Sequence, residues 1–123
     1  MSAPRPHPEI FLRVFLGPDM IGPGKAALLE GIARSGSISA AGRDMGMSYK
    51  RAWSLVETMN AMFAAPLVAS ARGGPGGGGA VLTETGHAVL ALYRRTEADA
   101  ADAIAPALDA LRTLQAPDHR EKP

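Results

Sequence analysis

The sequence of 123 residues contains no cysteine, which excludes disulfide bonds and thiolate metal sites. Its three histidines, His7, His87 and His119, lack the close spacing of metal ligands, so we expect no metal and no cofactor. No apolar run approaches a membrane span, and the proline-rich start lacks the apolar core of a secretory signal. We therefore expect a soluble, cytoplasmic protein with no membrane partner.

Charge and aromatic content are also low, and their distribution is more informative than their totals. The net charge is only +1. Residues 1–82 carry eight Lys or Arg against five Asp or Glu, whereas residues 83–123 carry five against seven. The first part of the chain is therefore the better candidate to meet phosphates, although such a bias is also typical of a solvated protein surface. The single tryptophan, Trp53, lies at the edge of an apolar stripe, and we expect it to support the fold rather than to stack on bases.

Apolar periodicity and turn residues predict a mainly helical domain with a small β-hairpin. Proline opens the first predicted helix and glycine ends it, while serine and threonine stand at the starts of the later ones. We expect Pro106 to kink or interrupt the last helix. The predicted elements are a strand at 9–16, helices at 23–34, 38–45 and 49–63, a hairpin of strands 67–71 and 80–82, and a long helix at about 84–115.

The chain is thus predicted to contain one domain at residues 9–115. Residues 1–8 are expected to form a disordered leader, and residues 116–123 a disordered tail. The strand at 9–16 would need a partner elsewhere, because a single strand is not stable alone.

Two short predicted helices meet at Gly46, and the second one is rich in basic residues near its start. A helix pair joined by a glycine-containing turn is typical of a helix-turn-helix, whose second helix lies in the major groove of DNA. Lysine and arginine donate hydrogen bonds to guanine, and hydroxyl groups bind phosphates or base edges. A basic pair alone would more simply be a solvated helix face. The candidate DNA-binding residues in the two helices are Ser37, Ser48, Tyr49, Lys50, Arg51 and Ser54.

The predicted hairpin that follows has a glycine-rich tip, as expected for a wing beside the recognition helix. Glycine lets the backbone approach DNA closely, and a basic residue at the base of the hairpin suits phosphates or the minor groove. A flexible linker would have a similar composition. A nucleotide-binding loop is disfavoured because no Gly-Lys-Ser/Thr follows the glycines. The candidate wing residues are Arg72, Gly73, Gly74, Gly76 and Gly77.

Several motifs occur together in one order: SGSIS at 35–39, SYKRAW at 48–53, ETMN at 57–60 and GGPGGGGAVLT at 73–83, followed by Gly86 and Leu92-Tyr93. With them, residues 10 to 105 resemble the N-terminal domain of the molybdate-responsive ModE regulators, and more loosely the LysR-type regulators. The resemblance implies a winged helix-turn-helix that binds a palindromic operator as a dimer. It also implies that the helix after the wing forms the dimer. The residues we expect in that contact are Val89, Leu92, Tyr93, Ile104, Leu108 and Leu111.

These observations predict a transcriptional regulator that binds double-stranded DNA in a sequence-specific manner as a homodimer and is not an enzyme. The full-length ModE family carries C-terminal oxyanion-binding domains, and we find no counterpart here. Direct binding of molybdate or another oxyanion to this chain is therefore not expected. The alternative is an interaction module that does not bind DNA and pairs with a full-length regulator through its last helix.

Overall fold

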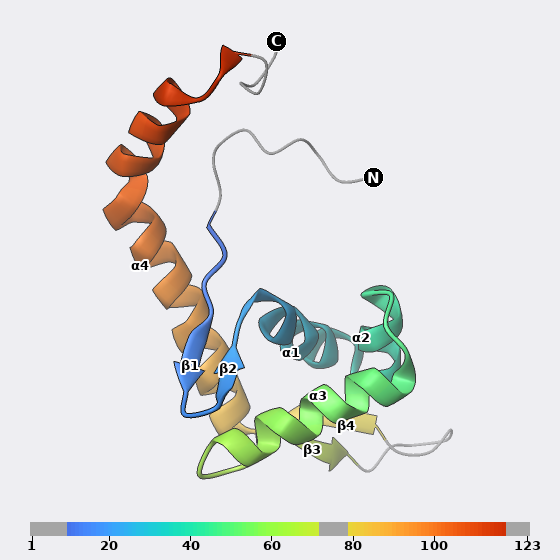
Figure 1. The fold of residues 1–123 in the computed structure, drawn as a ribbon. Coiled ribbons are helices and arrows are strands. Elements are labelled where there is room, and N and C mark those ends of the chain that lie inside the picture. Colours follow the sequence, from blue (N-terminus) through green and yellow to red (C-terminus); the bar gives the residue numbers. More distant parts are fainter. Residues whose placement is uncertain (1–9, 72–78, 118–123) are drawn as a thin grey trace.

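A computed structural model of the chain describes residues 10–71 and 79–117, which form a small helical bundle, two hairpins and one long projecting helix (Figure 1). The predicted fold class, a mainly helical winged helix-turn-helix followed by a long helix, is confirmed. Within these residues no helix is long and apolar enough to cross a membrane. In chain order the elements are β1 (Val14–Leu16), β2 (Asp19–Ile21), α1 (Pro23–Ser35), α2 (Ile38–Asp44), α3 (Tyr49–Met62), β3 (Val68–Ala71), β4 (Gly79–Leu82) and α4 (Glu84–Leu114).

The short helix α2 packs closely against both of its neighbours because glycines lie at the two contacts. A β-carbon on Gly31 of α1 would come within 2.9 Å of the Ala41 β-carbon. A β-carbon on Gly42 of α2 would come within 2.8 Å of the Ala52 β-carbon on α3. These approaches leave no room for larger side chains. The core beneath them consists of buried apolar residues from all four helices and both hairpins. The largest fully buried ones are Leu28, Leu29, Ile32, Met59, Leu67 and Val56.

The predicted helix boundaries are formed by the residues expected to form them. The side chains of Ser37, Ser48 and Thr83 each accept a hydrogen bond from the backbone amide three residues further on, at 2.9–3.1 Å. These bonds satisfy amides that have no partner inside the helix. Gly36 and Gly46 both have a φ of +74°, the left-handed conformation that glycine adopts most easily. The chain can therefore reverse direction sharply after α1 and after α2.

The prediction of one strand at residues 9–16 with a distant partner was wrong. Only Val14–Leu16 forms a strand, and it pairs antiparallel with Asp19–Ile21 immediately after it. Gly17, with a φ of +71°, takes the first central position of a two-residue loop, and Pro18 takes the second. Glycine at that position is typical of tight hairpins. The Gly-Pro pair therefore joins two strands instead of only ending one. β3 and β4 form the second antiparallel hairpin, as predicted.

Helix α4 is the longest element and runs away from the bundle (Figure 1). Its 31 residues include Pro106. The helix continues through this proline, although an interruption or a kink was expected there. At 1.5 Å per residue the helix is about 46 Å long. Only Gly86 and Tyr93 of α4 are buried, and both lie in its first third. The predicted leader at 1–8 lies outside the described residues, and only residues 116–117 of the predicted tail are described.

Candidate nucleic-acid interface

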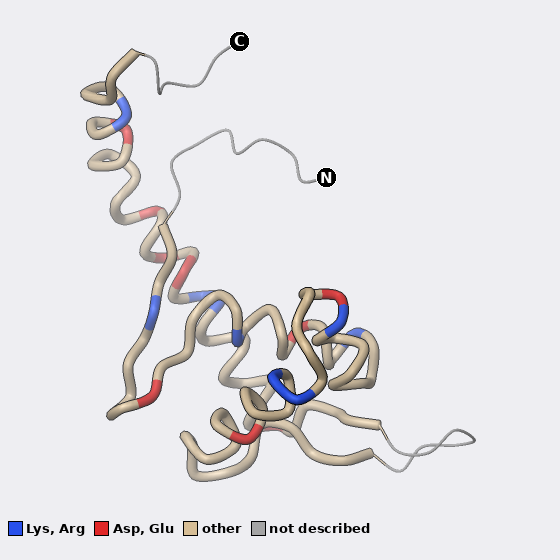
Figure 2. The backbone as a smooth tube through the Cα atoms, turned by 45° about the vertical axis from the view of Figure 1, so that its right-hand side comes forward, with Lys and Arg blue, Asp and Glu red and all other residues tan. Residues whose placement is uncertain are grey.

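The first turns of α3 present a polar and basic surface to solvent. Ser48, Tyr49, Lys50, Arg51 and Ser54 are all exposed. The opposite side of the same helix is buried in the core through Ala52, Val56 and Met59. Figure 2 shows the two adjacent basic positions near the start of α3, on the part of the helix farthest from the long arm of α4.

The exposed side of α3 is divided by helical geometry into an outer stripe and two flanks. The outer stripe consists of Lys50, Ser54 and Glu57, which are spaced by four and three residues along the helix. The carboxylate of Glu57 therefore lies about one turn beyond the hydroxyl of Ser54. Tyr49 and Trp53 form the flank nearest the second hairpin, with their rings edge to face and centroids 6.1 Å apart. Trp53 is 37% exposed, so it is a surface residue as well as a support for the fold.

A groove of about 140 Å³ separates this aromatic flank from the second hairpin. Ser37 and Ser39 of the α1–α2 region line one side, and Gly79 of β4 lines another. Ser37 is half-buried and its hydroxyl caps α2. Sequence reasoning missed Ser39, although the SGSIS motif contains it, because only the capping serine has a signal that propensity rules recognise.

The base of the predicted wing is fixed to the α1–α2 turn. The amide of Ala80 donates to the Gly36 carbonyl at 2.9 Å. A β-carbon on Gly79 would come within 2.7 Å of that carbonyl oxygen, so only glycine fits there without displacement. The wing residues predicted from sequence, Arg72, Gly73, Gly74, Gly76 and Gly77, lie outside the described residues.

The other strand of the hairpin is fixed to the last turns of α3 by Asn60. Its Oδ1 accepts hydrogen bonds from the amides of Leu67 and Val68 at 2.8 and 3.0 Å, and its Nδ2 donates to the Val68 carbonyl at 3.2 Å. Both strands of the hairpin are therefore joined to the helices by hydrogen bonds, β3 at its open end and β4 at the end next to the loop. Asn60 belongs to the ETMN motif, but its role depends on residues eight positions away and has no local signal.

The residues predicted for dimer contact occupy different environments on α4. Leu92 and Leu111 are 63% and 64% exposed, whereas Ile104 and Leu108 are half-buried. Val89 is half-buried and packs against the core. Tyr93 is only 4% exposed, and its hydroxyl donates to the Leu12 carbonyl at 2.7 Å, so this ring supports its own chain. Burial is the main reason that the pKa of Tyr93 is raised.

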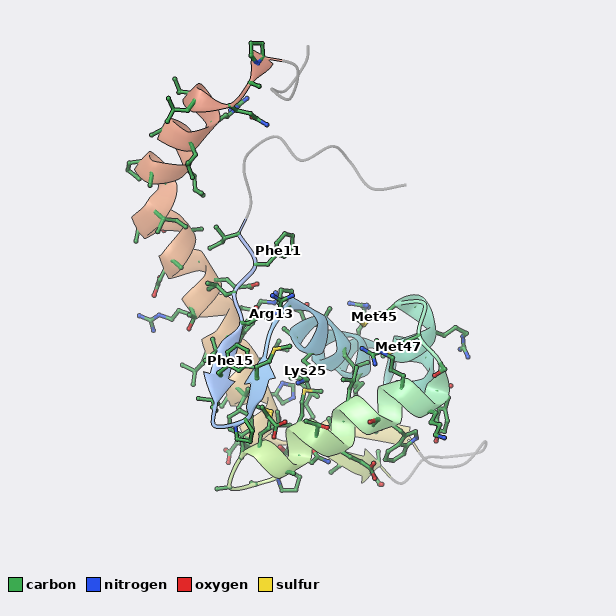
Figure 3. All side chains as sticks on the ribbon, viewed as in Figure 1. Phe11, Arg13, Phe15, Lys25, Met45 and Met47 are labelled. Atoms are coloured by element: carbon green, nitrogen blue, oxygen red, sulfur yellow. The ribbon has the colours of Figure 1, made fainter. Side chains whose placement is uncertain are left out.

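The first hairpin extends the apolar surface of α4 in a way that the sequence did not predict. Phe15 and Leu16 of β1 are 64% and 47% exposed, and Phe15 projects outward from the hairpin in Figure 3. A groove of about 200 Å³ runs between this hairpin and α4, and its lining is almost wholly apolar, including Val14, Leu16, Val89 and Leu92. The hairpin was missed because the strand was expected to pair elsewhere.

The start of α4 is held against α1 by charged groups. The guanidinium of Arg94 donates to both carboxylate oxygens of Glu30, at 2.7 and 2.9 Å, and to Glu97 at 2.7 Å. The hydrogen bonds that Arg94 donates to Glu30 are the main cause of both the lowered pKa of Glu30 and the raised pKa of Arg94. This two-bond geometry fixes the direction in which α4 leaves the bundle.

Over residues 10–71 and 79–117, no group of three or more His, Cys, Asp or Glu side chains is arranged to hold a metal ion. No buried side-chain nitrogen or oxygen in this part of the chain lacks a hydrogen-bond partner.

The chain is 52% identical over 81 residues to the molybdenum-pterin-binding protein MopB of Rhodobacter capsulatus, which covers 66% of this chain and 30% of the relative. It is 49% identical over 71 residues to the DNA-binding transcriptional dual regulator ModE of Escherichia coli K12, covering 58% of this chain and 27% of the relative. It is 43% identical over 77 residues to the molybdenum transport protein ModE of Azotobacter vinelandii, covering 63% and 28%.

The chain thus spans less than a third of the length of these relatives. No protein-family model matches it. The relatives are named for regulation, molybdenum transport or pterin binding. At about half identity over some three fifths of this chain, the comparison confirms the resemblance to the ModE family that the motifs predicted, and it makes the chain a homologue of the ModE regulators and the Mop proteins.

Proposed function

We propose that this protein is a transcriptional regulator that binds a palindromic DNA operator as a homodimer. In this proposal α3 enters the major groove, the hairpin of β3 and β4 lies beside it as a wing, and α4 forms the dimer contact. One operator half-site would then be read by each copy. The two half-sites would be about 34 Å apart, one turn of DNA.

The observation that carries the proposal is the exposed start of α3. Lys50 and Arg51 are exposed, and among the described residues neither takes part in an ion pair. Ser48 caps the start of α3, and the buried side of the helix packs into the core. The side chains of Lys50 and Arg51 therefore project from a helix that is held in place. Basic side chains in the first turns of such a helix are those that reach base edges. The relative from Escherichia coli is named as a DNA-binding regulator.

Exposed leucines on α4 support the proposed dimer. Leu92, Leu111 and Leu114 are between 63% and 82% exposed, and the apolar groove beside the first hairpin is continuous with Leu92. A single winged module buries only about 600–1,000 Å² on DNA, so two linked modules bind much more tightly than one. The same leucines would also serve the alternative function, in which α4 pairs with a longer regulator without DNA.

Selection of genomic binding sites with the purified protein tests the proposal. We expect a palindromic sequence whose affinity falls steeply as salt rises, because phosphate contacts release counterions. A matched selection with molybdate present measures whether this oxyanion changes the selected sequence or the affinity for it, as the names of the relatives make worth testing. Recovery of no enriched sequence, together with salt-insensitive pairing to a longer relative, would favour the alternative.

A further inference from the structure

A second hollow, of about 350 Å³, lies on the flank of α3 that faces away from the wing. One of its sides is formed by the chain before β1 and by the β2–α1 junction, and the other by the α2–α3 turn and the first half of α3. Figure 3 shows Arg13 and Lys25 near the start of α1, and Met47 beyond α1 toward the α2–α3 turn. The side chains that define the hollow are Arg13, Met20, Lys25, Met47, Arg51 and Leu55.

Two of the three basic residues, Arg13 and Lys25, lie close to the start of α1. The Cγ atom of Arg13 lies 3.4 Å from the position that a β-carbon of Gly22 would take, so its stem crosses directly over the start of α1. The Nζ atom of Lys25 donates to the Met20 carbonyl at 2.7 Å. That bond uses one of the three ammonium protons, and Lys25 is half-buried. The Lys25 ammonium group is therefore held at the rim of the hollow, and the exposed Arg13 lies beside it near the start of α1.

The positive charge of this rim is not neutralised by its surroundings. The residues that line the hollow include three basic side chains and no acidic one. Within the described parts of the chain, Arg13, Lys25 and Arg51 form no ion pair. The first turn of α1 also contains no acidic residue. An anion that entered the hollow would meet basic groups from two directions.

The position of the hollow on α3 indicates which anion it suits. Successive residues of a helix project about 100° apart, so Arg51 projects about 160° from Tyr49 and from Trp53. The hollow and the aromatic groove beside the wing therefore lie on opposite flanks of α3. A helix with its side chains is about 10–12 Å wide and fills the major groove, which is about 12 Å wide. Each flank would then face one of the two phosphate backbones that border the groove.

We infer that Arg13, Lys25 and Arg51 form a phosphate clamp, which holds the DNA backbone on the side of the recognition helix opposite the wing. This inference rests on the proposed function and adds contacts from outside the helix-turn-helix. Arg13 and Lys25 carry no sequence information in this role, because phosphate contacts set the register of the protein on DNA without reading bases. They contribute affinity for operator and non-specific DNA alike.

The test compares wild type with the double variant Arg13→Gln/Lys25→Gln, on the selected operator and on a random duplex of equal length. The plot of log affinity against log salt should become less steep by about 1.8, since each phosphate contact adds about 0.9 to the slope. Affinity for both duplexes should fall by about tenfold at low salt. Arg95→Gln is the matched control, because Arg95 is exposed on α4 and pairs only weakly with Asp99 at 3.6 Å. Thermal unfolding confirms that each variant is folded.

The possible outcomes separate this inference from the proposed function. If wild type selects no DNA sequence, the proposed function fails and the clamp fails with it. If wild type selects an operator and the double variant binds with the same affinity and salt slope, only the clamp is overturned. Inorganic phosphate at constant ionic strength gives a further comparison. Phosphate that binds wild type but not the variant, and leaves the DNA affinity of wild type unchanged at millimolar phosphate, would assign the hollow to a free oxyanion and overturn the backbone contact.

Discussion

Asn60 and Val68 exchange two hydrogen bonds, one from the Val68 amide to Oδ1 at 3.0 Å and one from Nδ2 to the Val68 carbonyl at 3.2 Å. The side chain thus pairs with β3 as a neighbouring strand would. It does so from the last turns of α3, which joins the recognition helix to the first strand of the wing. The position of the hairpin relative to α3 therefore depends on this amide side chain as well as on the bond from Ala80 to Gly36 on the other strand.

Replacing Asn60 with Ala should destabilise the protein by about 2 kcal/mol, because the Leu67 and Val68 amides would lose their acceptor. Asn60→Asp keeps the acceptor oxygen and removes only the donor, so the protein should lose less stability in this variant than in Asn60→Ala. Urea unfolding of both variants measures the difference. Equal losses in the two variants would show that acceptance by Oδ1 is not the stabilising contact.

Replacing Gly86 with Ala should destabilise the protein by about 3 kcal/mol or more, because the new β-carbon would overlap the backbone carbonyl of Leu67. A shift of α4 could relieve the overlap only by breaking the Thr83 contacts at the helix start. Gly24→Ala is the matched control, since nothing lies within 4 Å of a β-carbon there. That change should be neutral or stabilising by up to about 1 kcal/mol, as alanine is the better helix former. Thermal unfolding of the two variants would contradict the prediction if their midpoints were equal.

The Glu30–Arg94 contact should make stability depend on pH in the acid range. The pKa of Glu30 is lowered in the folded protein, mainly by the hydrogen bond from Arg94. A carboxyl group with a lowered folded pKa stabilises the fold above its unfolded pKa, near 4.5, and this stabilisation is lost as pH falls through the folded value. The difference in unfolding free energy between wild type and Glu30→Gln should therefore shrink below about pH 4.5. A difference that stays constant from pH 7 to pH 3 would refute it.

Replacing Arg51 with Ala should lower operator affinity about tenfold to a hundredfold, because the charge-assisted contact to the DNA backbone that the clamp assigns to it would be lost. The unfolding midpoint should hardly change, because the side chain is exposed and only its backbone amide takes part in the helix cap. Arg95→Ala is the control, since it removes the same charge from α4. Fluorescence anisotropy with a labelled operator measures the DNA affinity of both variants. Equal affinity of wild type and Arg51→Ala would remove this residue from the interface.

Replacing Leu92 with Asp should weaken the proposed dimer, because a charge would replace an exposed leucine beside the apolar groove. Ala98→Asp adds the same charge at a position about 120° around α4, on its exposed side. Sedimentation equilibrium should show a lower mass for Leu92→Asp alone. A dimer of unchanged strength in Leu92→Asp would place the contact elsewhere on the chain.

Features with a local cause were predicted well from the sequence. Ser48 and Thr83 cap helices through bonds to amides three residues away, and Gly46 adopts a positive φ where a tight turn needs it. Each depends on the residue type and its immediate neighbours. Helix α3, with its buried stripe and exposed basic start, follows from apolar spacing for the same reason.

Features that depend on distant contacts were missed. The sequence contains no local sign that Arg94 binds Glu30, 64 positions earlier, or that Arg13 and Lys25 lie around one hollow with Arg51. Tyr93 was expected to face a second copy because its spacing suits an apolar helix face. It instead reaches the Leu12 carbonyl, 81 positions away, so its burial could not be inferred from periodicity alone.

The helical order of the projecting part of α4 depends on what covers its apolar side chains. No residue of this helix beyond Tyr93 is buried, and Leu114 near its end is 82% exposed. Helical turns without tertiary packing are only marginally stable in water, so in an isolated copy the outer turns depend on the helix preference of alanine. A second copy that covered the leucines would supply apolar burial and helical order in one step. Far-UV ellipticity per residue would then rise with protein concentration, in step with formation of the dimer.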